Sequence, residues 1–242
     1  MNASDVAVAE LAIAPGNLAG DGAPSAALRE GPVRIRHLGM TPSVHPEAYV
    51  APTAVLSGQV SVGAGSCVLH GAVLAAAGGP VQIGAGCVIM ENAVLRGTAR
   101  HPLLMGDRVL VGPHAQLTGA AVADQVFIAV GAVVLNGAHL GRAATVAAGA
   151  VVHLGAIVAP QARIPVGWVA VGDPARIYPP GEAEPIRAGV AEASPAFLHY
   201  VLGVDDAGGR RDQLQAALAR YTAAMARHHS QDQIIPASYG GR

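Results

Sequence analysis

Histidine, glutamate and arginine side chains in the middle of the chain have the types needed for acid/base chemistry on an anionic substrate. Histidine is the side chain that most often acts as a general acid or base, which makes His70 and His114 candidates, and Glu91 can orient a histidine through its carboxylate. Arg96 presents a planar, permanently charged fork that binds carboxylates or phosphates, and the Thr118 hydroxyl can add a hydrogen bond. We therefore predict His70, His114 and Glu91 as catalytic residues and Arg96 and Thr118 as substrate-binding residues.

These residues belong to a repeat of six. Aliphatic side chains recur at every sixth position, with short interruptions after Leu74, Leu95 and Leu117: Val44, Val50, Leu56, Val62, Val68, Leu74, Ile83, Ile89, Leu95, Met105, Val111, Leu117, Val122, Ile128, Val134, Leu140, Val146, Val152, Val158 and Ile164. A helix would need spacings of three and four, and an ordinary strand a spacing of two. The period of six therefore indicates short strands joined by tight turns.

A second set of positions, four residues after each of these, is small or β-branched wherever the repeat is unbroken, as at Ala54, Ser66, Cys87, Ala115 and Ala150. Three hexads, each with one large and one small inward residue, close a triangular coil, and successive coils stack about 4.8 Å apart. This packing accounts for a chain that is 52% hydrophobic but only 3% aromatic. The predicted fold class is all-β, a parallel β-helix of hexapeptide repeats with a C-terminal α-helix.

The extent of the repeat predicts three segments: an irregular N-terminal extension over 1–41, the β-helix over 42–177, and a linker with a C-terminal helix over 178–242. A short strand is expected at Val33–Leu38, and Gly78–Pro80 and Gly97–Leu104 are expected to leave the coil as loops.

Apolar residues near the C-terminus follow helical rather than hexad spacing. Leu214, Leu218, Tyr221 and Met225 lie on one face of a helix predicted over Asp212–His229. This apolar face should pack along the β-helix or on a neighbouring subunit.

Composition excludes several functions. All 15 basic residues are arginine, which excludes chemistry that needs a lysine amine. A net charge of −1 gives no electrostatic footprint for nucleic acid, and no apolar run approaches the roughly 20 residues of a membrane span. We expect a cytoplasmic protein that acts on a small molecule, with no nucleic-acid or membrane partner.

The repeat resembles the hexapeptide-repeat superfamily over about Val44 to Ile177. Members of that superfamily fold as left-handed parallel β-helices and are normally homotrimers. Within it, the chain looks most like the γ-carbonic anhydrase-like branch, through the stretches Val44–Pro46, Val68–Leu74, Ile89–Gly97, Val111–Gly119 and Gly167–Ile177.

That branch holds a zinc ion between two subunits with three histidines. The resemblance places those histidines at Arg96, Pro113 and Thr118, and none of these side chains replaces a neutral imidazole. We therefore predict no metal at this site and no carbonic anhydrase activity. A shifted metal site that uses His70 and His114 is left open.

The coil register predicts two columns of outward-facing residues. One column follows the aliphatic positions and contains Ala75, Arg96, Thr118, Leu135 and His153, whereas the preceding face carries His70, Glu91, Pro113 and Val130. In a family-like homotrimer the two columns of neighbouring subunits face each other, which gathers the predicted catalytic and binding residues. His101, in the second loop, is expected to overhang this cleft as a further substrate-binding residue. The alternative is that Arg96 and Glu91 form an ion pair between subunits and have no part in catalysis.

Three functions remain open. The first is a metal-independent enzyme that needs no cofactor and acts on a small organic substrate at the inter-subunit cleft. The second is a coenzyme A-dependent acyltransferase in which His70, His101 or His114 deprotonates the acceptor, and the third is a non-catalytic trimeric scaffold. Five other histidines are interpreted as structural or exposed: His37, His45, His199, His228 and His229.

Overall fold

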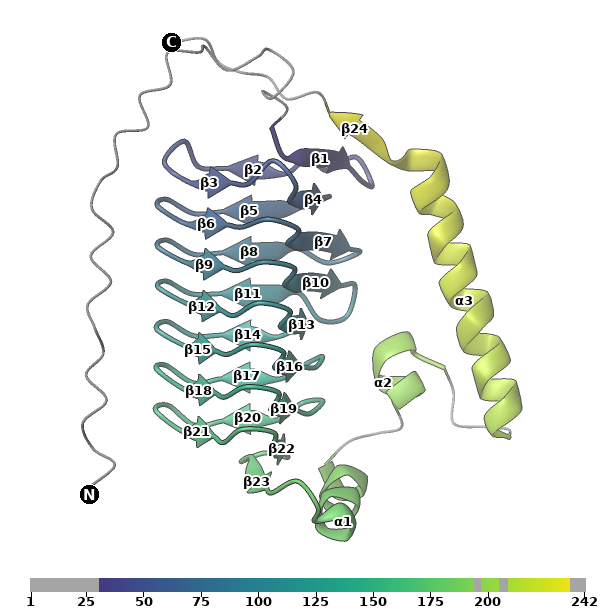
Figure 1. The fold of residues 1–242 in the computed structure, drawn as a ribbon. Helices are drawn as coiled ribbons and strands as arrows, with labels where there is room; N and C mark the ends of the chain where they lie inside the picture. Colours follow the sequence, from purple (N-terminus) through teal and green to yellow (C-terminus); the bar gives the residue numbers. More distant parts are fainter. Residues whose placement is uncertain (1–30, 194–196, 205–208, 236–242) are drawn as a thin grey trace, which may run out of the picture. The chain divides into compact units, whose positions relative to one another are not determined.

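The computed structural model describes residues 31–193, 197–204 and 209–235. Short strands stack coil upon coil, and each strand pairs with the equivalent strand of the next coil (Figure 1). This stacking builds three sheets around one apolar interior. The fold prediction, a left-handed parallel β-helix with a C-terminal α-helix, is confirmed.

The strands of each sheet are as follows. The first sheet contains β1 (Val33–Arg36), β4 (Val55–Ser57), β7 (Val73–Ala77), β10 (Val94–Thr98), β13 (Gln116–Thr118), β16 (Val133–Val134), β19 (Val151–Val152), β22 (Val169–Val171), β23 (Arg176–Tyr178) and β24 (Gln233–Ile235). The second contains β2 (Ser43–Val44), β5 (Val60–Val62), β8 (Val81–Ile83), β11 (Leu103–Met105), β14 (Ala121–Val122), β17 (His139–Leu140) and β20 (Ile157–Val158). The third contains β3 (Tyr49–Val50), β6 (Cys67–Val68), β9 (Val88–Ile89), β12 (Leu110–Val111), β15 (Phe127–Ile128), β18 (Thr145–Val146) and β21 (Arg163–Ile164).

The predicted aliphatic positions form the core. In the first sheet Leu74, Leu95 and Leu117 lie directly above one another, and all three side chains are fully buried. Every other aliphatic position of the repeat is also buried, except Val44 and Val50 of the first coil, which are partly buried and pack against the core. Because burial of one such side chain contributes about 1.5–3 kcal/mol, this regular stack is the main source of stability.

Close approach of successive coils explains why glycine often follows an aliphatic position. A Cβ built on Gly63 would lie 2.5 Å from the carbonyl oxygen of Gly84 in the next coil. The Gly63 N–H also donates to the carbonyl oxygen of Ile83 at 2.9 Å, which fixes this spacing. A side chain here would force the two coils apart.

The N-terminal part of the described chain joins the first sheet. The predicted strand at Val33–Leu38 is present as β1, but it ends at Arg36 because Leu38 and Gly39 turn through positive φ angles of 49° and 74°. β1 pairs in parallel with β4 and antiparallel with β24. Sheet pairing thus begins before position 42, within the predicted extension over 1–41, and residues 1–30 of that extension lie outside the described residues.

The two predicted loops are short. Gly78–Pro80 connects β7 to β8, and the residues outside strands in the second loop are only 99–102, because β10 extends to Thr98 and β11 begins at Leu103. The Thr98 N–H donates to the carbonyl oxygen of His101, and the His101 N–H donates to that of Thr98, which closes a tight turn. This turn stands at one end of the candidate site.

Three helices follow the β-helix in the part of the chain that the structure describes. The predicted C-terminal helix is present as α3 (Arg210–Gln231), and α1 (Ala183–Ala193) and α2 (Phe197–Leu202) form within the segment expected to be a linker. The apolar stripe of α3 stays 37–57% exposed, whereas Ala217 is 3% exposed. The buried face of α3 is therefore rotated by one position from the predicted face. No helix among the described residues is long and apolar enough to cross a bilayer.

Candidate functional site

A cavity of about 440 Å³ lies between the outer face of the first sheet and α3. Strands of the first sheet contribute Ala75, Ala77, Arg96, Thr98 and Thr118, and α3 contributes Arg220, Tyr221, Ala224, Met225, Arg227 and His228. The turn after β1, the two loops and α2 complete the wall. Two of the five residues predicted at first to act together, Arg96 and Thr118, therefore line one cavity.

The β-helix register positions Arg96 and Thr118. Each directly follows a buried leucine, so its side chain points outward when the leucine points inward. Arg96 pairs with Ala75 on one neighbouring strand and with Thr118 on the other. The predicted column is thus present, and the small Ala75 side chain leaves room beside the guanidinium.

Positive charge dominates the cavity. The lining residues include Arg96, Arg100, Arg220 and Arg227, and no aspartate or glutamate among the described residues lines it. Arg96 is half-buried, and its Nη1 donates to the Tyr221 Oη at 3.5 Å. Four guanidinium groups around one cavity favour a ligand with carboxylate or phosphate oxygens, which accept paired hydrogen bonds from the arginine fork.

The other three predicted residues lie at a different place in the coil. Backbone hydrogen bonds stack them at the corner between the third and first sheets: the Asn92 N–H donates to the His70 carbonyl at 3.1 Å, and the His114 N–H donates to the Glu91 carbonyl at 3.0 Å. His70 and His114 are exposed, and the His70 Nδ1 lies 2.9 Å from the Thr53 Oγ1. Within one chain, His70, Glu91 and His114 do not line the cavity of Arg96 and Thr118.

His101 lies beside the cavity but does not line it. Its ring stacks on Tyr200, with centroids 4.8 Å apart and an interplanar angle of 15°. Partial burial, and secondly the neighbouring Arg100 guanidinium, lower the pKa of His101 below its ordinary value. The neutral imidazole is therefore favoured, and its packing supports the end of the cavity.

A second hollow, of about 520 Å³, lies over the second sheet. Its lining is mostly aliphatic, including Leu104 and Ile157, and the only polar side chains among its lining residues are Gln82 and His139. One isolated imidazole and one amide provide little chemistry. The arginine-lined cavity is the stronger candidate site.

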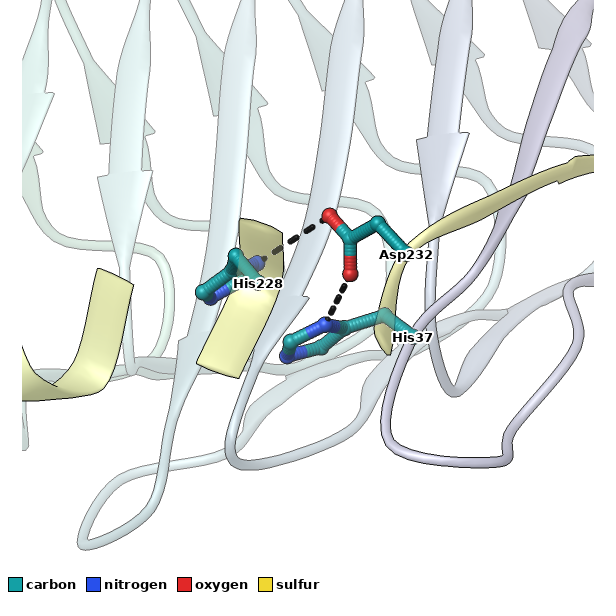
Figure 2. A group of neighbouring side chains, drawn as sticks. All are labelled: His37, His228 and Asp232. Carbon is teal, nitrogen blue, oxygen red and sulfur yellow. Dashed lines mark hydrogen bonds and ion pairs between the residues drawn. The ribbon is translucent and has the colours of Figure 1, made fainter. Parts of the chain in front are cut away.

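Two histidines that were interpreted as structural or exposed, His37 and His228, line another end of the arginine-lined cavity and form a group with Asp232. His37 is 2% exposed, and its Nδ1 lies 2.5 Å from the Asp232 Oδ1. The His228 Nδ1 lies 3.3 Å from the other oxygen of the same carboxylate, and the two imidazole rings stack at 3.7 Å (Figure 2). The sequence carries no local signal for this group, because His37 and Asp232 are 195 positions apart.

The positions that the resemblance assigns to zinc ligands do not fit a metal. The guanidinium of Arg96 is a permanent cation, Pro113 has no side-chain donor, and the Thr118 hydroxyl is a weak neutral ligand. Arg96 and Thr118 lie side by side on β10 and β13, and Pro113 lies in the corner column. These three residues cannot replace three imidazoles.

Comparison with known proteins gives the following similarities. No family profile matches the chain. Gamma carbonic anhydrase 1 of Arabidopsis thaliana mitochondria is 38% identical over 142 residues, which cover 56% of this chain and 49% of that protein. Gamma carbonic anhydrase 2 of the same organism is 34% identical over 143 residues, with the same coverage. The match thus spans about half the length of these curated relatives.

The chain is also similar to solved structures. A putative acetyltransferase of Bacillus cereus has a TM-score of 0.44 at 20% identity, covering 77% of this chain and 94% of that one. A hexapeptide transferase family protein of Anaplasma phagocytophilum has a TM-score of 0.42 at 18% identity, covering 82% and 99%.

Proposed function

We propose that this chain, a hexapeptide-repeat β-helix protein similar to the gamma carbonic anhydrases, is an enzyme that binds a small organic anion in its arginine-lined cavity and acts on it without a metal at the family's zinc position. The observation that carries this proposal is the set of four arginines around a cavity of about 440 Å³, with no lining carboxylate among the described residues. Such a site attracts anions and is unfavourable for a cationic substrate.

Arg96 is proposed as the principal anion ligand. It is half-buried, and the tyrosine hydroxyl beside it restrains its side chain, so less rotamer freedom is lost on binding. Thr118 on the adjacent strand can donate a hydrogen bond to the same group. A charge-assisted hydrogen bond of this kind contributes about 1.5–3 kcal/mol, equivalent to roughly 10- to 100-fold in affinity.

Acid/base catalysis is proposed to come from the corner column of a neighbouring subunit in a homotrimer. His70 or His114 would transfer the proton, and Glu91 would orient the imidazole. The exposure of both histidines supports this role, because a group buried within its own chain could not reach a neighbour's cavity. The uncovered apolar stripe of α3, with Leu214 51% and Leu218 57% exposed, supports assembly with further copies.

Coenzyme A-dependent acyl transfer is the second candidate, because the arginine cluster also suits the phosphates of that cofactor. In such a reaction the histidine would take the proton from the acceptor amine or hydroxyl, the acceptor would attack the thioester carbonyl, and the coenzyme A thiolate would leave.

Ligand binding tests the proposal directly. Succinate, inorganic phosphate and coenzyme A are titrated calorimetrically against the full chain, Arg96→Ala, and the control Arg163→Ala, which removes an exposed arginine of the third sheet. We expect at least one probe to bind the full chain and the control equally, and Arg96→Ala about 10-fold or more weakly. If no probe binds, or if Arg96→Ala binds as the control does, the anion site is wrong. Succinate or phosphate binding without coenzyme A binding favours the first candidate over acyl transfer.

The oligomeric state and the catalytic residues are tested by experiments other than ligand binding. Sedimentation analysis should give the mass of three chains, and a monomer at micromolar concentration would contradict the shared site. Once a substrate is identified, His70→Ala or His114→Ala should lower turnover by roughly 10²–10⁴-fold. Mixing either variant with Arg96→Ala should restore part of the activity, because some interfaces would then combine an intact column from each chain.

A further inference from the structure

We infer that His37, His228 and Asp232 form a binding site for one divalent transition-metal ion, with Zn²⁺ as the best fit, which joins the end of α3 to the first coil. One potential ligand atom from each residue lies within 4.8 Å of the others (Figure 2). Two imidazoles and one carboxylate form a ligand set that zinc and other late first-row metals bind, and that calcium and magnesium do not favour.

Backbone hydrogen bonds hold His37 and Asp232 in place. β24 pairs antiparallel with β1 in the register Arg36 to Gln233, so the next pair outward would be His37 and Asp232. His37 also forms two backbone hydrogen bonds with Met40, of 3.0 and 2.9 Å, across the turn that follows β1. The site therefore rests on a sheet edge and a closed turn, and it needs no folding of a loop around the metal.

The third ligand is fixed by the end of the helix. The Asp232 N–H donates to the His228 carbonyl at 2.9 Å and caps α3. This bond holds His228 one helical turn before Asp232, on the side from which its ring reaches the same carboxylate. Sheet pairing thus places Asp232 beside His37, and the cap places His228 beside Asp232.

Metal coordination requires a small rearrangement. Ligands at about 2.0–2.1 Å from a tetrahedral zinc are about 3.3 Å apart, so ligand atoms that now lie within 4.8 Å of one another must approach by up to about 1.5 Å. The two rings are nearly parallel, at 8°, and a metal in the plane of both requires one ring to turn. His228 is the ring with freedom to do so, because its side chain is 27% exposed and lines the cavity, whereas His37 is 2% exposed.

Charges of opposite sign surround the proposed metal position. Arg220 and Arg227 line the same cavity and disfavour a cation there, whereas the Asp232 carboxylate favours it. A water molecule from the cavity can complete the tetrahedron. The role of the metal is structural: it secures the wall of the arginine-lined cavity and is separate from the binding of the organic anion.

Metal titration tests the inference independently of the proposed function. Untagged, chelator-treated full chain is titrated with zinc chloride in a buffer without phosphate or carboxylates. We expect one zinc per chain with a micromolar or lower dissociation constant, and cobalt should give the visible absorption of a tetrahedral complex. His228→Ala and Asp232→Asn should each weaken zinc binding at least 10-fold, while the control His139→Ala, an exposed histidine of β17, should bind normally.

The choice of variants separates loss of metal binding from misfolding. Because His37 is almost fully buried, its replacement can disturb the first coil. The half-buried His228 and the exposed Asp232 therefore carry the test, with circular dichroism to verify the fold of their variants. Hydrogen exchange at the end of α3 should slow when zinc is added to the full chain and not when it is added to Asp232→Asn. Absence of stoichiometric zinc binding, or unchanged binding by folded His228→Ala and Asp232→Asn, would overturn the metal site and leave the anion proposal untouched.

Discussion

Truncation of one inward leucine should be unusually costly in this fold. Leu117 is fully buried and stacks between Leu95 and Val134, which are themselves 0% and 1% exposed. Leu→Ala substitutions in protein cores cost about 2.7–5.0 kcal/mol, and the cost rises with the volume of the cavity that remains. Here the backbone ladder between coils keeps the neighbouring side chains about 4.8 Å apart, so they cannot collapse into the gap. We therefore expect Leu117→Ala to cost at least as much as the middle of this range, about 4 kcal/mol.

Equilibrium urea unfolding at fixed chain concentration, followed by circular dichroism, measures this loss. The matched control is Leu104→Ala, an outward-facing leucine of β11 that is 40% exposed and lies outside the apolar stripe of α3, for which we expect a change within about 0.5–1 kcal/mol. Because about 1 kcal/mol shifts the melting temperature of a chain this long by roughly 2–4 °C, Leu117→Ala should melt roughly 8–16 °C lower. A loss below about 1.5 kcal/mol for Leu117→Ala would refute the idea that the coil spacing is rigid.

Two further predictions concern titratable and reactive side chains. Burial holds the pKa of His153 below its ordinary value, and burial followed by the Arg100 guanidinium does the same for the pKa of His101. Just below a pH of about 6.5, the unfolded chain therefore binds more protons than the folded chain. The free energy of unfolding should be highest above this pH. It should decrease as the pH falls towards the folded-state pKa values. Urea unfolding across this range measures the fall, which should be smaller in His153→Gln; a pH-independent stability would contradict it. Burial also raises the pKa of the Cys87 thiol, which is 0% exposed, whereas Cys67 is half-buried. A thiol-specific disulfide reagent should modify Cys67 first in the native chain and Cys87 only on unfolding, and equal rates would show that the coil opens locally.

The architecture could be predicted because its determinant is local. A hexad needs only one large and one small inward residue, and the same register continues through Val122, Val134 and Val152 without reference to distant parts of the chain. The helix around Leu218 was equally visible through its period. α1 was not predicted, because few of its aliphatic residues are partly buried: Ile186 and Val190 form one pair on one face. The prolines around this segment also indicate a linker.

The candidate site could be predicted only in part. Coil register alone places Arg96 beside Thr118, since pairing between successive coils is set by the repeat. Arg220 and Arg227 reach the same cavity because α3 packs over that face, and neither the direction of a helix after a linker nor its rotation follows from its own apolar stripe. The repeat also predicts the column of His70 and Glu91, and backbone hydrogen bonds between successive coils stack these residues and His114 as expected. Whether they meet Arg96 depends on how copies of the chain assemble.

The amino-acid sequence by itself determined the coil, the buried positions and the column that carries Arg96, because hydrogen bonding and burial repeat within each successive 18 or so residues. The tertiary structure alone decided the second wall of the cavity and the contact of His37 with Asp232. That contact joins residues 195 positions apart through the antiparallel pairing of β1 with β24. Such pairing depends on the free edge that the first coil leaves and on where α3 ends, and no short-range pattern encodes either.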